Sequence, residues 1–311
     1  MDKYFRLPIR TLGHKRIYYN QIIINDYLKS LMGLFDKFNT LRFANLMMET
    51  TPKIELTKTI DDAYEYIKNN DEIGKESIRE LYSILSSKDL EEAEKESMGE
   101  YYRKNLEFIS GSSMFLIKKI GPNPEELDKY MDNFIEYIQN EKMDDFIKSQ
   151  IMGLYLVYIH PYPNLNGRMS RMLSSWHLIK EHKYSCMIFN RIPSYERGKY
   201  VKNIKSIYNH GNITPFLMFV LKEVKNGLEK MQVIEKINDY NKIVDTETFR
   251  LLEYLLTLDS PSLELLYKVN FMHNRYMSKV DILEKLSKYL EDKIIILEDN
   301  TYHINEKIIT R

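Results

Sequence analysis

The residues that interrupt helices or cross-link extracellular folds are scarce in this sequence. Its 311 residues include 11 glycines, 9 prolines and a single cysteine, Cys186. One cysteine cannot form an internal disulfide, so we expect a chain that works in a reducing compartment, with Cys186 as a small buried apolar residue. Because glycine and proline are the residues least compatible with a helix interior, their scarcity favours long helices.

An excess of charge and long apolar runs are also missing. The chain has 45 basic and 45 acidic residues, so its overall charge neither indicates nor excludes a nucleic-acid partner. No apolar run reaches the roughly 18 residues typical of a membrane span. Residues 1–6 hold no apolar stretch of the kind found in signal peptides. We therefore expect a cytoplasmic, globular protein without a membrane partner.

What the sequence does have is a helical spacing of apolar residues along most of its length. Asn123 and Pro124 form a sharp helix start, with asparagine as N-cap and proline at the first helical position. Nearly every residue from 151 to 159 is apolar, which predicts a central helix covered on several sides. The sequence thus predicts an all-α fold class, with helices over residues 21–49, 57–69, 75–87, 124–138, 144–159, 168–182, 194–208 and 215–233.

Three segments depart from this helical pattern. Residues 1–20 are irregular, with a short strand expected over 4–9. The heavily charged stretch 88–96 predicts a solvated loop or a frayed helix. Near Ser110–Lys119 a Ser/Gly turn adjoins a short apolar run, which indicates a small β-hairpin.

The end of the chain predicts a separate domain. Three helices followed by two short strands are the order of a winged helix-turn-helix, and a linker near residues 238–244 would precede them. The elements expected there are helices over 249–256, 260–268 and 274–289, and strands over 293–297 and 302–304. The predicted organisation is an N-terminal helical region (1–98), a core (99–237) and this winged-helix-like domain (244–311).

The third helix of the terminal domain would be the one that reads DNA. Its polar residues include both signs of charge, namely Asn274, Arg275, Lys279 and Lys285 against Asp281, Glu284 and Glu291. Winged helices also serve as protein-contact or dimer modules. The sequence therefore leaves open both DNA binding through 244–311 and homo-oligomerisation.

The polar segment His160–Arg171 carries the strongest chemical signal. It joins the central helix to a second helix, in whose first turn Arg168 and Arg171 project from one face. The unpaired N–H groups of that turn and the helix dipole favour an anion there, and two guanidiniums bind phosphate oxygens as forks. His160 can act as a general base near neutral pH. The pattern indicates a polyphosphate site, although such loops are often mere connections whose arginines meet carboxylates of neighbouring helices.

This segment resembles the signature of the Fic family, which reads His-Pro-Phe, any residue, Asp or Glu, Gly, Asn-Gly-Arg, any two residues, Arg. Gly99–Arg103 resembles the family's Gly-x-Tyr-Arg lead-in with one extra residue, and the likeness extends over roughly residues 20–230. It implies a Fic-fold helical bundle, with the hairpin as the flap that docks the target protein. The positions that match the signature in identity and spacing are His160, Pro161, Asn166, Gly167, Arg168 and Arg171.

The resemblance implies a protein adenylyltransferase that moves AMP from ATP, with Mg²⁺, onto a Ser, Thr or Tyr hydroxyl. His160 would accept the hydroxyl proton. Backbone N–H groups of Asn166 and Gly167 would form the anion hole. Arg168 would bind the β-phosphate and Arg171 the γ-phosphate.

The resemblance also concerns three further positions, two of which depart from the family's pattern. Tyr200 lies where a tyrosine of the family often borders the nucleotide base. Asn164 stands at the position of the Mg²⁺-binding carboxylate, and its amide oxygen brings no charge. Leu165 replaces a glycine, which costs roughly 1–2 kcal/mol if the backbone there needs a positive φ. These departures leave open a transferase of another phosphoryl group, or a catalytically weak homologue that acts as a DNA-binding regulator.

Many members of the family also carry an inhibitory helix whose glutamate pairs with the second motif arginine. Residues 45–50 resemble a degenerate form of it, which would pair Glu49 with Arg171. The alternative is an ordinary solvated carboxylate at a helix end. His177 and His182 are five residues apart, which is not the spacing of two metal ligands on one helical face, and we expect both at the surface.

Overall fold

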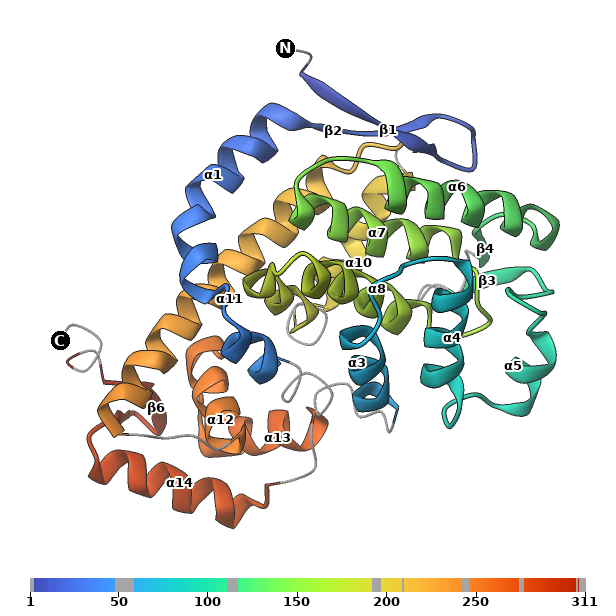
Figure 1. Cartoon of the computed structure of the whole chain (residues 1–311). Helices are drawn as coiled ribbons and strands as arrows, with labels where there is room; N and C mark the ends of the chain where they lie inside the picture. Colours follow the sequence, from blue (N-terminus) through green and yellow to red (C-terminus); the bar gives the residue numbers. More distant parts are fainter. Residues whose placement is uncertain are drawn as a thin grey trace. The chain divides into compact units, whose positions relative to one another are not determined.

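The structure is a computed structural model, and it describes residues 3–47, 59–110, 117–191, 197–208, 210–241, 246–273, 277–305 and 307. Two compact units divide the chain (Figure 1). The first comprises Met1–Met48 and Thr57–Val224, and the second comprises Glu49–Leu56 and Lys225–Arg311.

The first unit is the predicted helical bundle, with two β-hairpins added. Residues 41–47 are also helical, and short 3₁₀ segments cover Pro124–Glu126, Tyr184–Arg191 and Lys205–Tyr208. Its helices are α1 (Gln21–Phe38), α3 (Ile60–Lys68), α4 (Lys75–Ser86), α5 (Glu92–Ser97), α6 (Leu127–Asn140), α7 (Asp145–Ile159), α8 (Asn166–Lys180), α10 (Arg197–Ile204) and the first part of α11 (Thr214–Asn241).

The pair α7 and α8 forms the centre of this unit (Figure 1). Every residue of α7 from Phe146 to Leu156 is buried, as the unbroken apolar run predicts. Gly153 lets the two helices approach closely, because a Cβ there would lie 2.5 Å from Oγ of Ser174 and 3.0 Å from Oγ of Ser170. The Ser170 hydroxyl donates a hydrogen bond to the Gly153 carbonyl at 2.8 Å, so a hydrogen bond also joins the two helices at this point.

Other elements cover this central pair. Helix α6 packs against α7, and α3 and α4 pack against α8. The predicted strand near residues 4–9 is confirmed as β1 (Tyr4–Arg10). Its antiparallel partner β2 (Arg16–Asn20) was not predicted, because two short strands joined by Gly13 and His14 leave little periodicity to recognise.

The predicted hairpin near Ser110–Lys119 is confirmed in its two strands. These are β3 (Glu107–Ser110) and β4 (Ile117–Ile120), which pair antiparallel with Glu107 opposite Ile120. Residues 111–116 lie outside the described part of the chain. The charged stretch 88–96 includes all but the last residue of the short helix α5, as the frayed-helix alternative predicts.

The second unit contains the predicted order of three helices and a hairpin. Its elements are α12 (Thr246–Thr257), α13 (Leu263–His273), α14 (Lys279–Glu291), β5 (Ile295–Glu298) and β6 (Thr301–Ile304). Strands β5 and β6 pair antiparallel, and Leu266, Ile282 and Leu286 are fully buried between the elements. The last helix of the bundle, α11, continues to Asn241, through part of the stretch in which we predicted a linker.

The third helix of this unit, α14, carries three lysines and three acidic residues. Lys279 is paired with Glu264 of α13. Asn274 and Arg275, which we expected to contribute to DNA reading, lie outside the described residues. DNA binding and homo-oligomerisation therefore stay predictions.

Two expectations about single residues can be compared with the structure. Cys186 is buried, as predicted, at 2% exposure. The expectation that His177 lies at the surface was wrong, since the residue is 5% exposed and its Nε2 lies 3.4 Å from Asp145. His177 lies on a face of α8 that meets the start of α7, where Asp145 is, whereas His182 follows the end of α8 and is exposed. Within the described ranges, no helix combines the length and apolar character that crossing a membrane requires.

Candidate active site

The central helix α7 ends in a strained histidine. His160 is its C-cap, with φ 53° and ψ 60°, and its N–H donates to the Leu156 carbonyl at 2.9 Å. Left-handed backbone is usual for glycine or asparagine at this position and uncommon for other residues. Strain of this kind persists where surrounding structure holds it and is often found at functional sites.

A second left-handed residue opens the next helix. Leu165, the N-cap of α8, has φ 64° and ψ 8°, so this position does require the positive φ that the sequence analysis made conditional. The strain of a leucine there, about 1–2 kcal/mol, is offset by burial of its side chain, which is 7% exposed. Leucine offers no side-chain oxygen to the first turn of α8. The N–H groups of that turn, which no helical carbonyl can satisfy, thus keep their capacity to bind an anion.

Between these two residues, the side chain of Asn166 braces the loop. Its Oδ1 accepts from the Tyr162 N–H at 3.1 Å, and its Nδ2 donates to the Tyr162 carbonyl at 2.7 Å. The Tyr162 ring is fully buried and stacks on Tyr82 of α4, with centroids 3.8 Å apart and planes 7° apart. Asn166 therefore shapes the connection through its side chain, and what it can offer a ligand is its backbone.

Tyr162 supplies a stability prediction. Among the described residues its buried hydroxyl has no hydrogen-bond partner, and such a group costs about 1–3 kcal/mol. Tyr162→Phe should therefore raise the free energy of unfolding by about 1 kcal/mol, measured by denaturant titration. The control is Tyr155→Phe, which should lower it, because the Tyr155 hydroxyl donates to the Arg10 carbonyl at 2.9 Å. A loss of stability in Tyr162→Phe would contradict the prediction.

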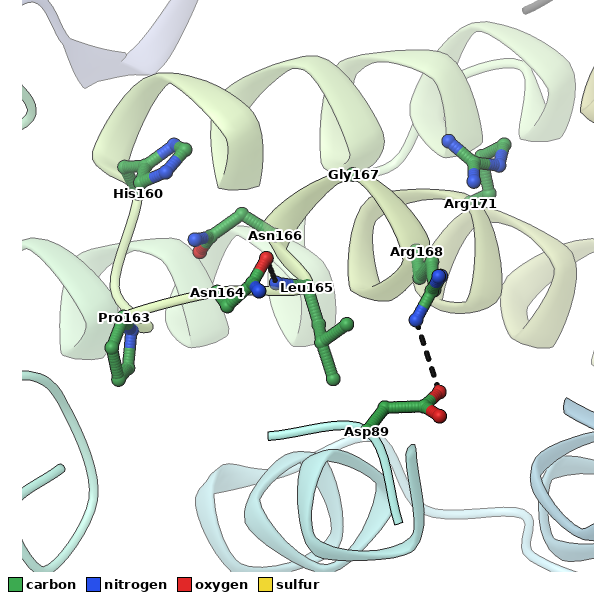
Figure 2. A pocket seen from close by; sticks show the side chains of 9 residues that line it. All are labelled: Asp89, His160, Pro163, Asn164, Leu165, Asn166, Gly167, Arg168 and Arg171. Atoms are coloured by element: carbon green, nitrogen blue, oxygen red, sulfur yellow. Dashed lines mark hydrogen bonds and ion pairs between the residues drawn. The ribbon is translucent and has the colours of Figure 1, made fainter. Parts of the chain in front are cut away.

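The connection borders a pocket of about 440 Å³ (Figure 2). That volume lies within the usual range for small-molecule sites, about 300–1,000 Å³. Figure 2 shows the imidazole at one end of the connection and the two guanidiniums at the other. The described residues that line the pocket are Asp89, His160, Pro163, Asn164, Leu165, Asn166, Gly167, Arg168 and Arg171.

Gly167 keeps the first turn of α8 open toward this pocket. A Cβ built on Gly167 would meet a single group within 4 Å, Nη1 of Arg171 at 3.5 Å. That is an ordinary contact, so the protein itself does not require a glycine here. The missing side chain instead leaves the backbone N–H groups accessible, which a phosphate needs.

Two carboxylates of the segment 88–97 reach the same pocket region. Nη1 of Arg168 lies 3.0 Å from Oδ2 of Asp89, with the two side chains 29% and 21% exposed (Figure 2). Nδ2 of Asn164 donates to Oε1 of Glu94 at 2.6 Å, while its Oδ1 accepts from the Leu165 N–H at 2.6 Å. An anion that binds Arg168 through Nη1 must therefore compete with Asp89.

His160 has the protonation state of a base. Burial lowers the pKa of His160 to about 4, and the positive charge of Arg103 lowers it further. A hydrogen bond to the Val157 carbonyl, 3.3 Å from Nδ1, acts in the opposite direction. Because the Val157 carbonyl can only accept, we assign the ring proton to Nδ1. The unprotonated Nε2 is then the atom that can take a proton.

The fit for a divalent cation is weaker than the fit for phosphate. Within the described ranges, no three His, Cys, Asp or Glu side chains are arranged to hold a metal ion. The Asn164 oxygen is neutral and already accepts one hydrogen bond. The nearby Glu94 carboxylate supplies charge, and Mg²⁺ is commonly held by one or two carboxylates together with substrate phosphates.

The structure thus brings together six of the predicted site residues, namely His160, Asn164, Asn166, Gly167, Arg168 and Arg171. Tyr200 is not among the described residues of the pocket, and its ring packs edge-to-face on Phe216 of α11. Glu49 lies outside the described residues. Asp89 was missed, although the expectation that clustered arginines meet neighbouring carboxylates pointed to a partner of its kind.

Comparison with known proteins agrees with this geometry. The model of the Fic/DOC family matches residues 72–178, which run from α4 through the pocket to α8. This chain contains a Fic domain. The domain therefore includes both the hairpin β3–β4 and the connection with its two left-handed residues.

The similar proteins extend the likeness beyond the domain. A protein named adenylyltransferase Fic from Nematostella vectensis is 23% identical over 232 residues, which cover 71% of this chain and 51% of that protein. One of the same name from Drosophila erecta is 30% identical over 125 residues, 39% of this chain and 23% of that protein. This chain thus spans about half or less of the length of these relatives.

A solved structure supports the fold. A Fic family protein from Desulfovibrio desulfuricans G20 matches with a TM-score of 0.51 and 15% sequence identity, over 90% of this chain and 93% of that one. At this identity the likeness concerns the fold alone. The all-α Fic fold predicted from the sequence is confirmed.

Proposed function

We propose that this protein is a protein adenylyltransferase, which transfers AMP from ATP to a Ser, Thr or Tyr hydroxyl of a target protein. The observation that carries the proposal is the pocket in which an unprotonated imidazole, two guanidiniums and the open N-terminus of α8 meet. The names of the relatives from Nematostella and Drosophila support the same reaction. The target would dock at the hairpin flap near Ser110–Lys119.

In the proposed reaction the target hydroxyl oxygen attacks the α-phosphorus of ATP. A bond forms between that oxygen and the α-phosphorus, the bond from the α-phosphorus to the bridging oxygen breaks, and pyrophosphate leaves. The hydroxyl proton moves to Nε2 of His160. Arg168 and Arg171 bind the departing phosphates, and the N–H groups of the first turn of α8 stabilise the charge on the α-phosphate.

The direct test is intact-mass analysis of the protein after incubation with ATP and Mg²⁺, alone and with candidate targets. The expected result is an added adenylyl group. An added phosphate group would instead identify a transferase of another phosphoryl group, the alternative that the altered positions Asn164 and Leu165 leave open. No added mass on any protein, together with a salt-dependent shift of DNA on gels, would favour the regulator.

Asn164 supplies a prediction about metal use. Asn164→Asp should tighten Mg²⁺ binding and raise transfer, because it places a second carboxylate beside Glu94. Without metal the same pair of like charges should destabilise the loop, so Mg²⁺ should raise the unfolding temperature more in this variant than in the wild type. The measurements are thermal unfolding with and without Mg²⁺ and the transfer rate.

The matched control is Asn164→Asp combined with Glu94→Gln, which should lose most of the gain in Mg²⁺ binding. Equal or lower activity of Asn164→Asp, with its fold intact, would remove Asn164 from the metal site.

A further inference from the structure

The strained histidine needs a group that holds its backbone in place. Left-handed geometry at a residue with a side chain costs about 1–2 kcal/mol, so contacts from the surrounding structure have to hold His160 in it. The Arg103 guanidinium provides such a group, since its Nε donates to the His160 carbonyl at 2.7 Å. The Arg103 backbone N–H donates to the next carbonyl, that of Pro161, at 2.9 Å.

Arg103 is itself fixed on several sides. Its side chain is 2% exposed, so its orientation is set by the protein and not by solvent. Nη1 donates to the Asn105 carbonyl at 2.6 Å, and Nη2 donates to the Pro122 carbonyl at 2.8 Å. A planar guanidinium can serve three acceptors in fixed directions, which a lysine ammonium cannot reproduce.

Two of these three acceptors lie at the two ends of the hairpin. Asn105 lies two residues before β3, and Pro122 lies two residues after β4. Between β4 and Pro122, Gly121 has φ 70°, and a Cβ there would lie 2.0 Å from the Ile159 carbonyl and 3.0 Å from Nη2 of Arg103. Glycine is therefore required where the base of the hairpin meets the end of α7.

We propose that Arg103 is a positioning residue that fixes His160 relative to both ends of the β3–β4 hairpin. One guanidinium bonds to the carbonyl before the hairpin, the carbonyl after it and the carbonyl of the histidine. A target docked on the hairpin would then present its hydroxyl to the His160 imidazole, and Arg103 would hold both the hairpin and the histidine in place. The part that concerns transfer rests on the proposed function, whereas the link between Arg103 and His160 can be tested without it.

The test compares Arg103→Lys, which keeps the charge and loses the fork, with the wild type. We expect kcat for transfer to fall about 100-fold, as a small misplacement of a catalytic group does, while Kd for ATP changes less than about threefold, since no contact of Arg168 or Arg171 is altered. The ring resonances of His160, followed by NMR over pH, should shift in position and titrate at a different pH. The control Arg79→Lys, at an arginine of α4 that lies over the Tyr101 ring, should leave all three unchanged.

Unchanged kcat and unchanged His160 resonances in Arg103→Lys would overturn the inference. Absence of transfer in the wild type would remove the proposed function, and a shift of the His160 resonances would still support the positioning role. If Arg103→Lys does not fold, exchange of the Arg103 Nε proton in the wild type decides, because a proton donated to the His160 carbonyl exchanges slowly. Exchange as fast as that of Arg79 would overturn the inference.

Discussion

Replacing His160 by alanine should abolish detectable transfer while the protein still binds ATP. A positioned general base contributes about 10²–10⁴-fold to rate, and His160 is the only residue lining the described pocket whose side chain is an unprotonated base of this kind. The two guanidiniums that we propose to bind phosphate lie at the other end of the connection, so ATP affinity should change little (Figure 2). Intact-mass analysis measures transfer, and calorimetric titration measures binding.

The control for this variant is His182→Ala, at an exposed histidine of the same unit, which should transfer at the wild-type rate. Transfer by His160→Ala at more than a tenth of the wild-type rate would exclude His160 as the base. The alanine also relieves little backbone strain, because it keeps a Cβ at the left-handed position. A change in stability should therefore not obscure the result.

The pH dependence follows from the same residue. A lowered pKa means that the imidazole is unprotonated above about pH 4, so the active form is present throughout the neutral range. The acid limb of the transfer rate should lie near pH 4 and not near 6.5, the usual value for histidine. A limb near pH 6.5 would show that burial does not lower the pKa of His160 as expected.

Replacing Arg168 by glutamine should weaken ATP binding about 10- to 100-fold, the range expected for losing charge-assisted hydrogen bonds to phosphate. The loss has two parts. The guanidinium no longer contacts the phosphates, and Asp89 is left facing them without its partner. The control Arg79→Gln removes the same charge from α4, away from the pocket, and should change Kd less than twofold or so. Equal affinities for Arg168→Gln and the wild type would exclude Arg168 as a phosphate ligand.

The opposite change is expected from Asp89→Asn. Because the Asp89 carboxylate occupies Nη1 of Arg168, removing its charge should tighten ATP binding about two- to fivefold, the range of a partly exposed ion pair. Glu96→Gln, at an exposed carboxylate of the same segment, is the control for net charge. In an Arg168→Gln background, Asp89→Asn should gain less, because only the repulsion of phosphate remains. Weaker binding by Asp89→Asn would mean that Asp89 orients Arg168 for the phosphate and does not compete with it.

The sequence predicted most of the fold because its helices are long and strongly patterned. The continuous apolar run in α7 and the start at Asn123 and Pro124 are local signals, and the structure places helices there. The strand β2 was missed because its pairing with β1 depends on a partner across a turn and not on its own periodicity. The burial of His177 was missed for a related reason, since the spacing of two histidines does not reveal which faces of α8 are covered.

The site was predictable in its spacing but not in its partners. The positions from His160 to Arg171 could be read directly, since a fixed connection between two helices carries them. Asp89 and Glu94 could not, because they are remote in sequence from Arg168 and Asn164, the two residues that they contact. The positive φ of Leu165 was a conditional expectation, because it depends on how the loop enters α8 and not on the identity of the residue.

The close contact of Gly153 with Ser170 and Ser174 shows that the geometry of the site also depends on residues outside the signature. This joint sets the spacing between the helix that ends in the imidazole and the helix that begins with the guanidiniums, yet it lies outside the pocket. A methyl group added at Gly153 would displace the Ser170 and Ser174 hydroxyls or separate the two helices, and separation would move the imidazole away from the guanidiniums. A homologue could thus keep every residue of the signature and still lack transferase activity. Whether a homologue is active therefore depends on the contact between the two helices as well as on the loop.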